Sequence, residues 1–291
     1  MTAQQLVLSL VLATMVFSVA LELKVADFTR VAQTPRAVIC GLIPQFVLLP
    51  AATWIVTLVL DLPPNIEAAM MLVAACPGGS LSNVVTHYGR GNTALSVSIS
   101  AVASVLALFL TPFNFTWMMA TNPDTANWMR QLSIDPLDIL WSLLGLLALP
   151  MTLGLLLGHH RPALTERIRK PLGTFSLLAL LAFIAIGLWQ QRALLTPNIL
   201  PQLLIVVLHN GLGLLLGWLC ALAFAVAERD ARAIVIEGGM QNSGLALGII
   251  AVQFKSDLGM VIIASLWGMW HIVSGMSLAI LWRRKDARLA L

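Results

Sequence analysis

Two short polar motifs interrupt the apolar sequence, and their residue types suit the binding of a cation. Residues 76–83 read CPGGSLSN and residues 237–244 read EGGMQNSG. Each motif joins a Gly-Gly pair to hydroxyl and amide side chains, and each has apolar sequence on both sides. Relative to alanine, glycine costs roughly 1 kcal/mol and proline roughly 3 kcal/mol inside a helix. Both motifs are therefore predicted to break a helix and to free backbone groups beside oxygen-bearing side chains.

Glu237 is the one acidic residue predicted to lie deep within an apolar segment, because Glu22 and Glu67 fall near segment ends. A carboxylate at membrane depth is costly and indicates a function. It could bind sodium or carry a proton. Sodium is favoured because neutral oxygens, which hard cations prefer, are frequent around both motifs. They belong to Ser82, Asn83, Ser96, Ser100, Gln241 and Asn242.

The composition predicts that lipid surrounds most of the chain. Of 291 residues, 59% are hydrophobic and 10% are charged, whereas soluble domains have about 25% charged residues. The net charge of +4 is attributed to basic cytoplasmic loops and not to nucleic-acid binding. Nucleophile-elbow, Walker A, HExxH and GxGxxG motifs are absent from the sequence, which argues against an enzyme or an ATP-driven pump.

Apolar runs bounded by charge, proline and glycine predict an all-α membrane protein with about nine transmembrane helices. The predicted spans are residues 3–22, 36–60, 64–89, 92–119, 138–158, 172–190, 200–227, 231–254 and 258–282. Of the 17 Lys and Arg residues, all but Arg130, Arg192 and Lys255 then lie on one side. The positive-inside rule predicts a multi-pass protein of the inner or plasma membrane, with its N-terminus outside and its C-terminus cytoplasmic.

The positions of the two breaks predict an internal repeat. The first break falls in the third of the first four spans, and the second falls in the fourth of the last five. Two inverted repeats of five helices, the first of which lacks its first helix, would give four spans followed by five and place each break in the corresponding helix. Paired interrupted helices in corresponding halves indicate the binding site of a secondary transporter.

Four blocks of sequence resemble the bile acid:sodium symporter family. They read CPGGSLSNVVTHYGRGNTALSVSIS, VVLHNGLGLLLG, IEGGMQNSGLA and WHIVSG, and the resemblance runs from residues 19–28 to the last span. It implies a core domain with two crossing broken helices, and a panel domain beside it. The panel would take residues 1–35 (panel helix 1) and 121–196 (the panel helices of repeat 2). The core would take residues 36–120, broken around 76–83, and residues 197–291, broken around 237–244.

The resemblance also implies two bound sodium ions and a neighbouring substrate site. The first sodium site would use Ser82, Asn83, Ser96, Ser100 and Glu237. The second would use Gln45, Glu237, Gly238, Met240 and Gln241. The substrate would lie near Ser80, Asn242 and His271.

Two positions depart from the family pattern. Gly238 replaces the usual valine of the second motif, and its backbone oxygen remains available to sodium. Ile272 stands where asparagine commonly follows the histidine of the last block, which removes a polar group near the predicted substrate cleft.

The leading hypothesis is a sodium-coupled secondary active symporter of an organic anion, which works by alternating access. Its partners would be membrane lipid and a small organic anion: bile acid-like, a steroid conjugate or a small carboxylate. No protein partner is evident. One alternative is a proton-coupled organic anion transporter that uses Glu237, and another is a membrane ligand-binding protein that does not transport.

Overall fold

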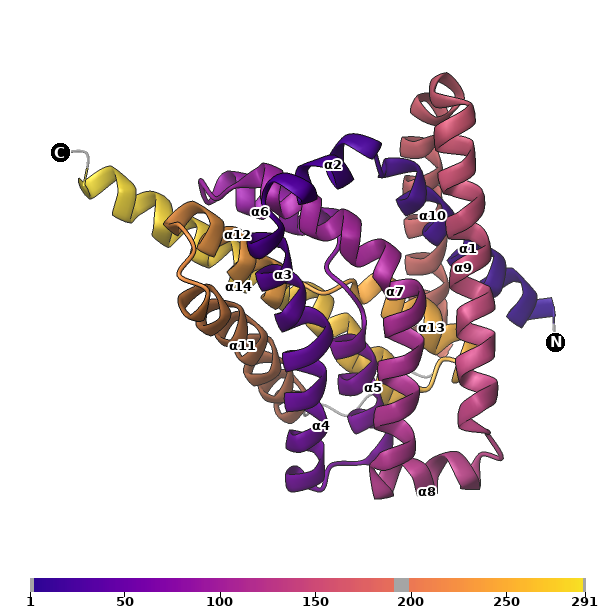
Figure 1. The fold of residues 1–291 in the computed structure, drawn as a ribbon. Coiled ribbons are helices and arrows are strands. Elements are labelled where there is room, and N and C mark those ends of the chain that lie inside the picture. The colour runs from indigo at the N-terminus through magenta and orange to yellow at the C-terminus, as the bar shows by residue number, and fades with distance from the viewer. Residues whose placement is uncertain (1–2, 191–198, 290–291) are drawn as a thin grey trace.

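The computed structural model describes residues 3–190 and 199–289, and within these ranges the chain forms helices and no β-strand (Figure 1). The prediction of an all-α chain is confirmed for this part of the sequence. In chain order the elements are α1 (Ala3–Glu22), α2 (Val25–Gln33), α3 (Pro35–Ile43), the π-helical turn η1 (Pro44–Leu48), α4 (Leu49–Leu60), α5 (Pro64–Ala75), α6 (Ser80–Tyr88), α7 (Thr93–Thr121), α8 (Pro123–Gln131), α9 (Pro136–His160), α10 (Pro162–Gln190), α11 (Leu200–Ala223), α12 (Glu228–Gly239), α13 (Ser243–Gln253) and α14 (Leu258–Leu289).

Six helical segments in the described residues are long and apolar enough to cross a membrane, and the bent pair α5–α6 makes a seventh if it is one span. The axes of α5 and α6 differ by 68°. These findings confirm a multi-pass helical membrane protein. The count of nine spans and the orientation of the termini stay predictions. Arg192, one of the three basic residues predicted on the less basic side, lies outside the described residues.

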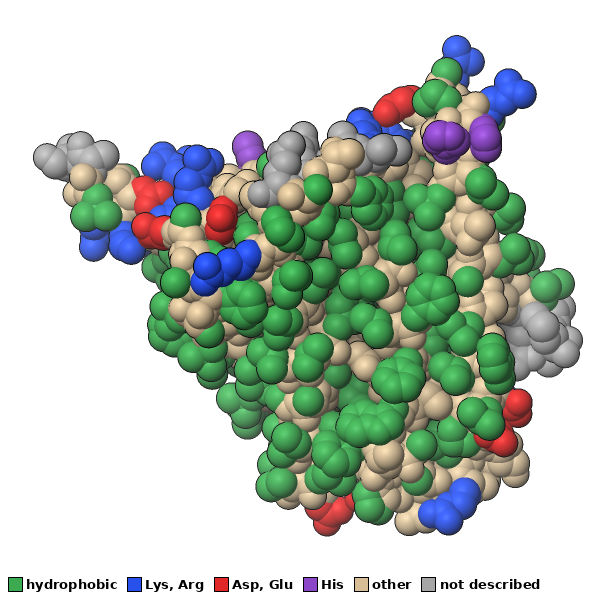
Figure 2. All heavy atoms as spheres, in the orientation of Figure 1, with side chains coloured by type: hydrophobic (Ala, Val, Ile, Leu, Met, Phe, Trp, Pro, Cys, Tyr) green, Lys and Arg blue, Asp and Glu red, His purple; other side chains and the backbone are tan. Residues whose placement is uncertain are grey.

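The surface fits a lipid environment. Figure 2 shows hydrophobic side chains covering a broad band of the molecule, with Lys, Arg, Asp and Glu gathered at its ends. Large aliphatic side chains such as Val59 (74% exposed) and Leu149 (65% exposed) lie in this surface. Contiguous exposed apolar surface on this scale indicates contact with lipid or with another protein.

The helices fall into two groups by their contacts. Helices α1, α9 and α10 pack on one another, and Figure 1 shows them together on one side of the molecule. Gly154 of α9 lets α1 approach closely, since a Cβ there would lie 2.5 Å from the Cβ of Ala20. This group meets the remaining helices mainly through α7 and α13.

The helix breaks have local causes in the sequence. Cys76 is extended (φ −77°, ψ 140°), as expected of a residue before a proline, so α5 ends at Ala75. Asn92 and Asn242 accept backbone N–H groups through their side chains and thereby start α7 and α13. These side-chain caps satisfy donors that the helix itself leaves unpaired.

One acidic residue lies deeper than the sequence indicated. Glu67 lies near the start of α5, as predicted, but its side chain is fully buried (0% exposed). Its carboxylate accepts the Leu62 backbone N–H at 3.2 Å and the Asn122 amide at 3.1 Å. Its burial comes from tertiary packing, since α8 contacts α5. Glu67 ties the connection between α4 and α5 to the corner between α7 and α8.

Candidate functional site

The two helix breaks touch each other. The backbone N–H of Asn242 donates to the carbonyl oxygen of Pro77 at 2.7 Å. The side chain of Asn242 accepts the Leu245 N–H at 2.9 Å and so begins α13 directly beside the end of α5. Residues about 165 positions apart in the sequence thus form one polar region inside the apolar core.

The five residues predicted for the first sodium site lie together around the carboxylate of Glu237. Ser82 of α6 and Ser96 of α7 each donate to its Oε1 at 2.6 Å. Ser100 of α7 contacts both carboxylate oxygens, at 3.0 and 3.2 Å. The amide oxygen of Asn83 lies 2.8 Å from Ser96 Oγ and 3.3 Å from Ser100 Oγ. Three helices therefore bring five oxygen-bearing side chains to one point.

This cluster is shielded from the surroundings. The side chains of Glu237, Ser82 and Ser96 are 0% exposed. Hydrogen bonds to Glu237 come only from neutral hydroxyls among the described residues. A buried anion with neutral oxygens around it has the donor set that a hard monovalent cation prefers.

Several residues predicted for the second sodium site converge on Gly78. A Cβ on Gly78 would lie 2.8 Å from Glu237 Oε2, 3.1 Å from the Met240 carbonyl oxygen and 3.4 Å from Gln45 Oε1. The Gly78 N–H donates to Gln45 Oε1 at 2.8 Å. The absence of a side chain at residue 78 is what allows these three oxygens to approach one another.

The two glutamines and Gly238 occupy different surroundings in this region. Gln45 belongs to the π-helical turn η1, a kind of local distortion that occurs often at functional sites. The Oε1 atom of Gln241 is buried, and no donor reaches it from the described residues. The carbonyl oxygen of Gly238 faces α11, where a Cβ on Gly213 would lie 2.6 Å away, and it also accepts the Gln241 amide at 3.4 Å.

The three residues predicted for the substrate site have different surroundings. Asn242 lines a cavity of about 30 Å³ whose other walls include α1 and α9. Ser80 is exposed at the start of α6. His271 lies on α14 at 3.5 Å from the hydroxyl of Ser243, and Ile272 beside it is 41% exposed.

Sequence reasoning missed one buried polar group at the second break. Asn210 of α11 donates to the Gly239 carbonyl oxygen at 2.6 Å and accepts from Ser274 of α14 at 2.6 Å. It thereby satisfies a carbonyl group that the end of α12 leaves free. An asparagine within the apolar run of residues 200–223 is the signal that marks it, because polar side chains at membrane depth commonly bond between helices.

The neighbouring histidine is held by hydrogen bonds at both ring nitrogens. Trp267 Nε1 donates to His209 Nδ1 at 3.2 Å, so Nε2 carries the proton of the neutral ring and donates to Thr53 Oγ1 at 2.8 Å. His209 is therefore a buried residue with a hydrogen-bond partner at each ring nitrogen. Cys40, Cys76 and Cys220 are buried free thiols.

Comparison with known proteins gives the same family as the motifs. A model of the sodium bile acid symporter family matches residues 9–198. The chain is 32% identical to the uncharacterized sodium-dependent transporter YocS of Bacillus subtilis over 96% of this chain and 83% of the relative. It is 31% identical to the probable sodium/metabolite cotransporter BASS1, chloroplastic, of Arabidopsis thaliana, over 91% of this chain and 63% of the relative. It is 27% identical to the human ileal sodium/bile acid cotransporter, over 86% of this chain and 70% of the relative.

The family match covers well over half of the chain, and the first of these relatives shares nearly its whole length. The broken helices, the buried carboxylate and the apolar surface are features of one membrane-embedded fold. The chain belongs to the sodium bile acid symporter family, a family of sodium-dependent transporters and not of enzymes.

Proposed function

We propose that this protein is a sodium-coupled secondary symporter of a small organic anion. The observation that carries the proposal is the convergence of Ser82, Ser96 and Ser100 on the buried Glu237 carboxylate. A cation at this point would draw α6, α7 and α12 together. Occupancy of the site would therefore favour one arrangement of the broken helices, and binding of sodium and substrate would be reciprocally coupled.

Two sodium ions share the Glu237 carboxylate in this proposal. The first takes oxygens from Ser82, Asn83, Ser96 and Ser100. The second takes oxygens from Gln45, Gly238, Met240 and Gln241. The orphaned Oε1 of Gln241 and the oxygens around Gly78 support the second site, since buried polar atoms in native proteins nearly always have a partner.

The substrate binds where the two breaks meet, near Ser80, Asn242 and His271. Helices α6 and α13 both begin at the breaks, so their N-termini lie there. Helix N-termini carry partial positive charge and favour anions, as in other transporters with broken helices. This arrangement supports a substrate with a carboxylate, sulfate or similar group.

Transport proceeds by alternating access between a panel and a core. The panel comprises residues 1–35 and 121–196, and the core comprises residues 36–120 and 197–291. Nine spans form an inverted five-helix repeat without its first helix, with the N-terminus outside and the C-terminus in the cytoplasm. The separate packing of α1, α9 and α10 supports this division.

Sodium-dependent thermal stability tests the proposal. Purified protein is unfolded in NaCl, KCl or choline chloride, with and without a panel of organic anions. A ligand at about 100 times its dissociation constant adds roughly 2.7 kcal/mol to the stability of the folded state. We expect stabilisation by sodium alone among the cations, a further rise with one class of anion, and loss of both effects in Glu237→Ala.

Uptake into proteoliposomes separates the alternatives. Uptake that follows a pH gradient and ignores sodium would identify Glu237 as a proton carrier. Binding of sodium and an anion without accumulation would indicate a protein that does not transport. A well-folded Glu237→Ala variant with unchanged sodium coupling would refute the proposed ion sites.

A further inference from the structure

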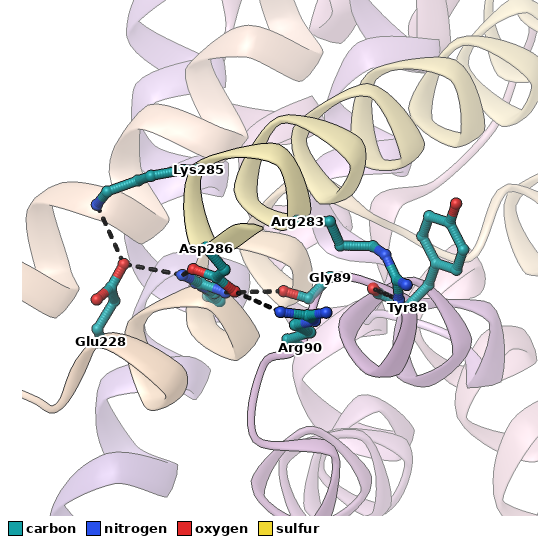
Figure 3. Close-up of polar contacts among 8 residues, drawn as sticks. Tyr88, Gly89, Arg90, Glu228, Arg283, Lys285 and Asp286 are labelled. Atoms are coloured by element: carbon teal, nitrogen blue, oxygen red, sulfur yellow. Dashed lines mark hydrogen bonds and ion pairs between the residues drawn. The ribbon is translucent and has the colours of Figure 1, made fainter. Parts of the chain in front are cut away.

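A second ionic cluster lies at the far end of the helices that carry the candidate sodium site. Its centre is Arg232 of α12, five residues before Glu237. At a rise of 1.5 Å per residue the two side chains start about 7.5 Å apart along the helix axis. Figure 3 shows the cluster between the C-terminal part of α14, the first turns of α12 and the end of α6.

Arg232 bonds to all three of these elements. Its guanidinium donates to both oxygens of Asp286 on α14, at 2.6 and 2.8 Å, and to Glu228 of α12 at 2.9 Å. It also donates to the carbonyl oxygen of Gly89, the residue that ends α6, at 3.1 Å. Arg283 donates to the Tyr88 carbonyl oxygen at 3.2 Å and adds a second link between α14 and α6.

The centre of the cluster is buried and its rim is exposed. The side chain of Arg232 is 6% exposed and that of Asp286 is 23% exposed. The pair formed by Lys285 and Glu228 is 60% and 61% exposed. Exposed ion pairs contribute little, whereas a buried guanidinium requires its counter-ion in place. The Arg232–Asp286 contact is therefore the part of the cluster that fixes geometry.

Glycines let the turn after α6 lie directly against α12 and α14. A Cβ on Gly89 would lie 3.1–3.3 Å from atoms of Trp282 and Ala279 of α14. A Cβ on Gly91 would lie 3.2 Å from the Cβ of Arg232. The turn is in van der Waals contact with both helices, so a displacement of Arg232 moves the end of α6.

The same turn holds the start of α7. The backbone N–H of Asn92 donates to the Arg229 carbonyl oxygen at 2.8 Å, and its side-chain amide donates to Asp230 at 2.7 Å. The side-chain oxygen of Asn92 caps α7 by accepting the Leu95 N–H at 3.1 Å. The three helices that form the candidate sodium site, α6, α7 and α12, are thus joined to one another at their common end.

We infer that Arg232 and Asp286 are positioning residues for sodium binding: they hold the ends of α6, α7 and α12 so that Ser82, Ser96 and Glu237 meet. This inference rests on the proposed sodium site. Neither residue touches the ion. Loss of their contact leaves every sodium ligand present but lets the ends of α6, α7 and α12 shift relative to one another, which weakens sodium binding.

The test is a sodium titration of thermal stability in the intact protein, with choline replacing sodium and no organic substrate present. Asp286→Asn keeps the shape of the side chain and removes its charge. We expect the half-saturating sodium concentration to rise about threefold to thirtyfold, the range in which residues that touch neither ligand change coupling. The matched controls are Arg284→Gln, an exposed residue two positions earlier on α14, and Lys285→Gln in the exposed rim. Both should bind sodium within twofold of the wild type.

Arg232→Lys provides an independent variant if Asp286→Asn does not fold. It keeps the positive charge but cannot make the two parallel bonds to Asp286 and the bond to Gly89 together, so its sodium affinity should also fall. A cluster that only stabilises the fold would lower the unfolding temperature in choline and leave the half-saturating sodium concentration unchanged. That result in either variant overturns the inference.

The Glu237→Ala variant distinguishes failure of the proposed ion site from failure of the positioning role of Arg232 and Asp286. A wild-type response to sodium in Glu237→Ala means that the proposed ion site is wrong. Loss of the response in Glu237→Ala together with wild-type sodium affinity in Asp286→Asn means that only the positioning role is wrong.

Discussion

Gly78 shows how a residue without a side chain can define a binding site. The oxygens of Gln45, Glu237 and Met240 lie around the point where its Cβ would be. Three oxygens with partial or full negative charge repel one another unless a donor or a cation lies among them. The Gly78 N–H supplies one donor, to Gln45, and we expect the cation to supply the rest.

Gly78→Ala is expected to weaken sodium binding at least tenfold. The added methyl group would lie 2.8 Å from Glu237 Oε2, closer than carbon and oxygen approach without a bond, so the carboxylate must move. Gly211→Ala is the control, because a Cβ at that position would meet nothing within 4 Å. Sodium titration of both variants gives the comparison. Equal sodium affinity in the two would exclude a cation site beside Gly78.

Much of the candidate site was predictable from residue type and spacing. The polar motifs identified Glu237, which precedes one Gly-Gly pair, and Ser82 and Asn83, which follow the other. Ser96 and Ser100 are four residues apart, a spacing that puts them on one helix face. Gln45 was found only through resemblance, because a lone glutamine in an apolar run carries no local pattern. The roles of Asn210 and Arg232 depend on contacts 29 to 143 residues away in the chain, which spacing does not reveal.

At the scale of elements, α11 and α12 are in backbone contact at the second break. A Cβ on Gly238 would lie 2.9 Å from the Gly213 carbonyl oxygen and 3.2 Å from the Cα of Gly217. Glycines spaced four apart let two helices approach in this way. The glycine at position 238 is therefore part of the packing between α11 and α12.

Gly238→Val is expected to destabilise the protein, because the larger side chain cannot enter the contact without separating α11 from α12. Overpacking of this kind typically costs about 1–3 kcal/mol, which lowers the midpoint of thermal unfolding by several degrees. Gly145→Val on α9 is the control, since a Cβ there meets nothing within 4 Å. A Gly238→Val variant as stable as this control would show that the helices separate freely.

The positions of the helices were predictable to within a few residues, whereas the burial of individual side chains was not. The run of residues 64–89 was predicted to break around residues 76–83, and the structure ends α5 at Ala75 and starts α6 at Ser80. Apolar runs and Pro or Gly breaks are local properties of the sequence. The burial of Glu67 depends on α8 folding back over α5, and no local pattern contains that information.

For the molecule as a whole, alternating access requires α1, α9 and α10 to move relative to the other helices. Leu12 of α1 and Gly248 of α13 lie at the contact between the two groups. A Cβ on Gly248 would be 3.5 Å from the Cβ of Leu12, a separation that suits a disulfide bond. Replacing both residues with cysteine also removes the leucine atoms that would clash.

The pair Leu12→Cys/Gly248→Cys is expected to stop uptake when oxidised and to recover it when reduced. The control pair is Ser18→Cys/Gly173→Cys, which links α1 to α10 within one group at a Cβ separation of 3.8 Å. That disulfide should leave uptake unchanged. The measurement for both cysteine pairs is sodium-driven uptake by proteoliposomes before and after reduction of the disulfide. Full uptake through the oxidised Leu12–Gly248 pair would exclude relative motion at this contact.

The π-helical turn at Pro44–Leu48 has an evolutionary consequence. Such a turn contains one residue more than the α-helical turn it replaces. Because the turn takes up this extra residue locally, deletion of one residue there would restore a regular α-helix and leave α4 in nearly its present register relative to α3, so Thr53 would stay beside His209. Among descendants of this chain, loss of one residue from this stretch should therefore change the position of Gln45, and with it the proposed second sodium site, while sparing the packing of α4.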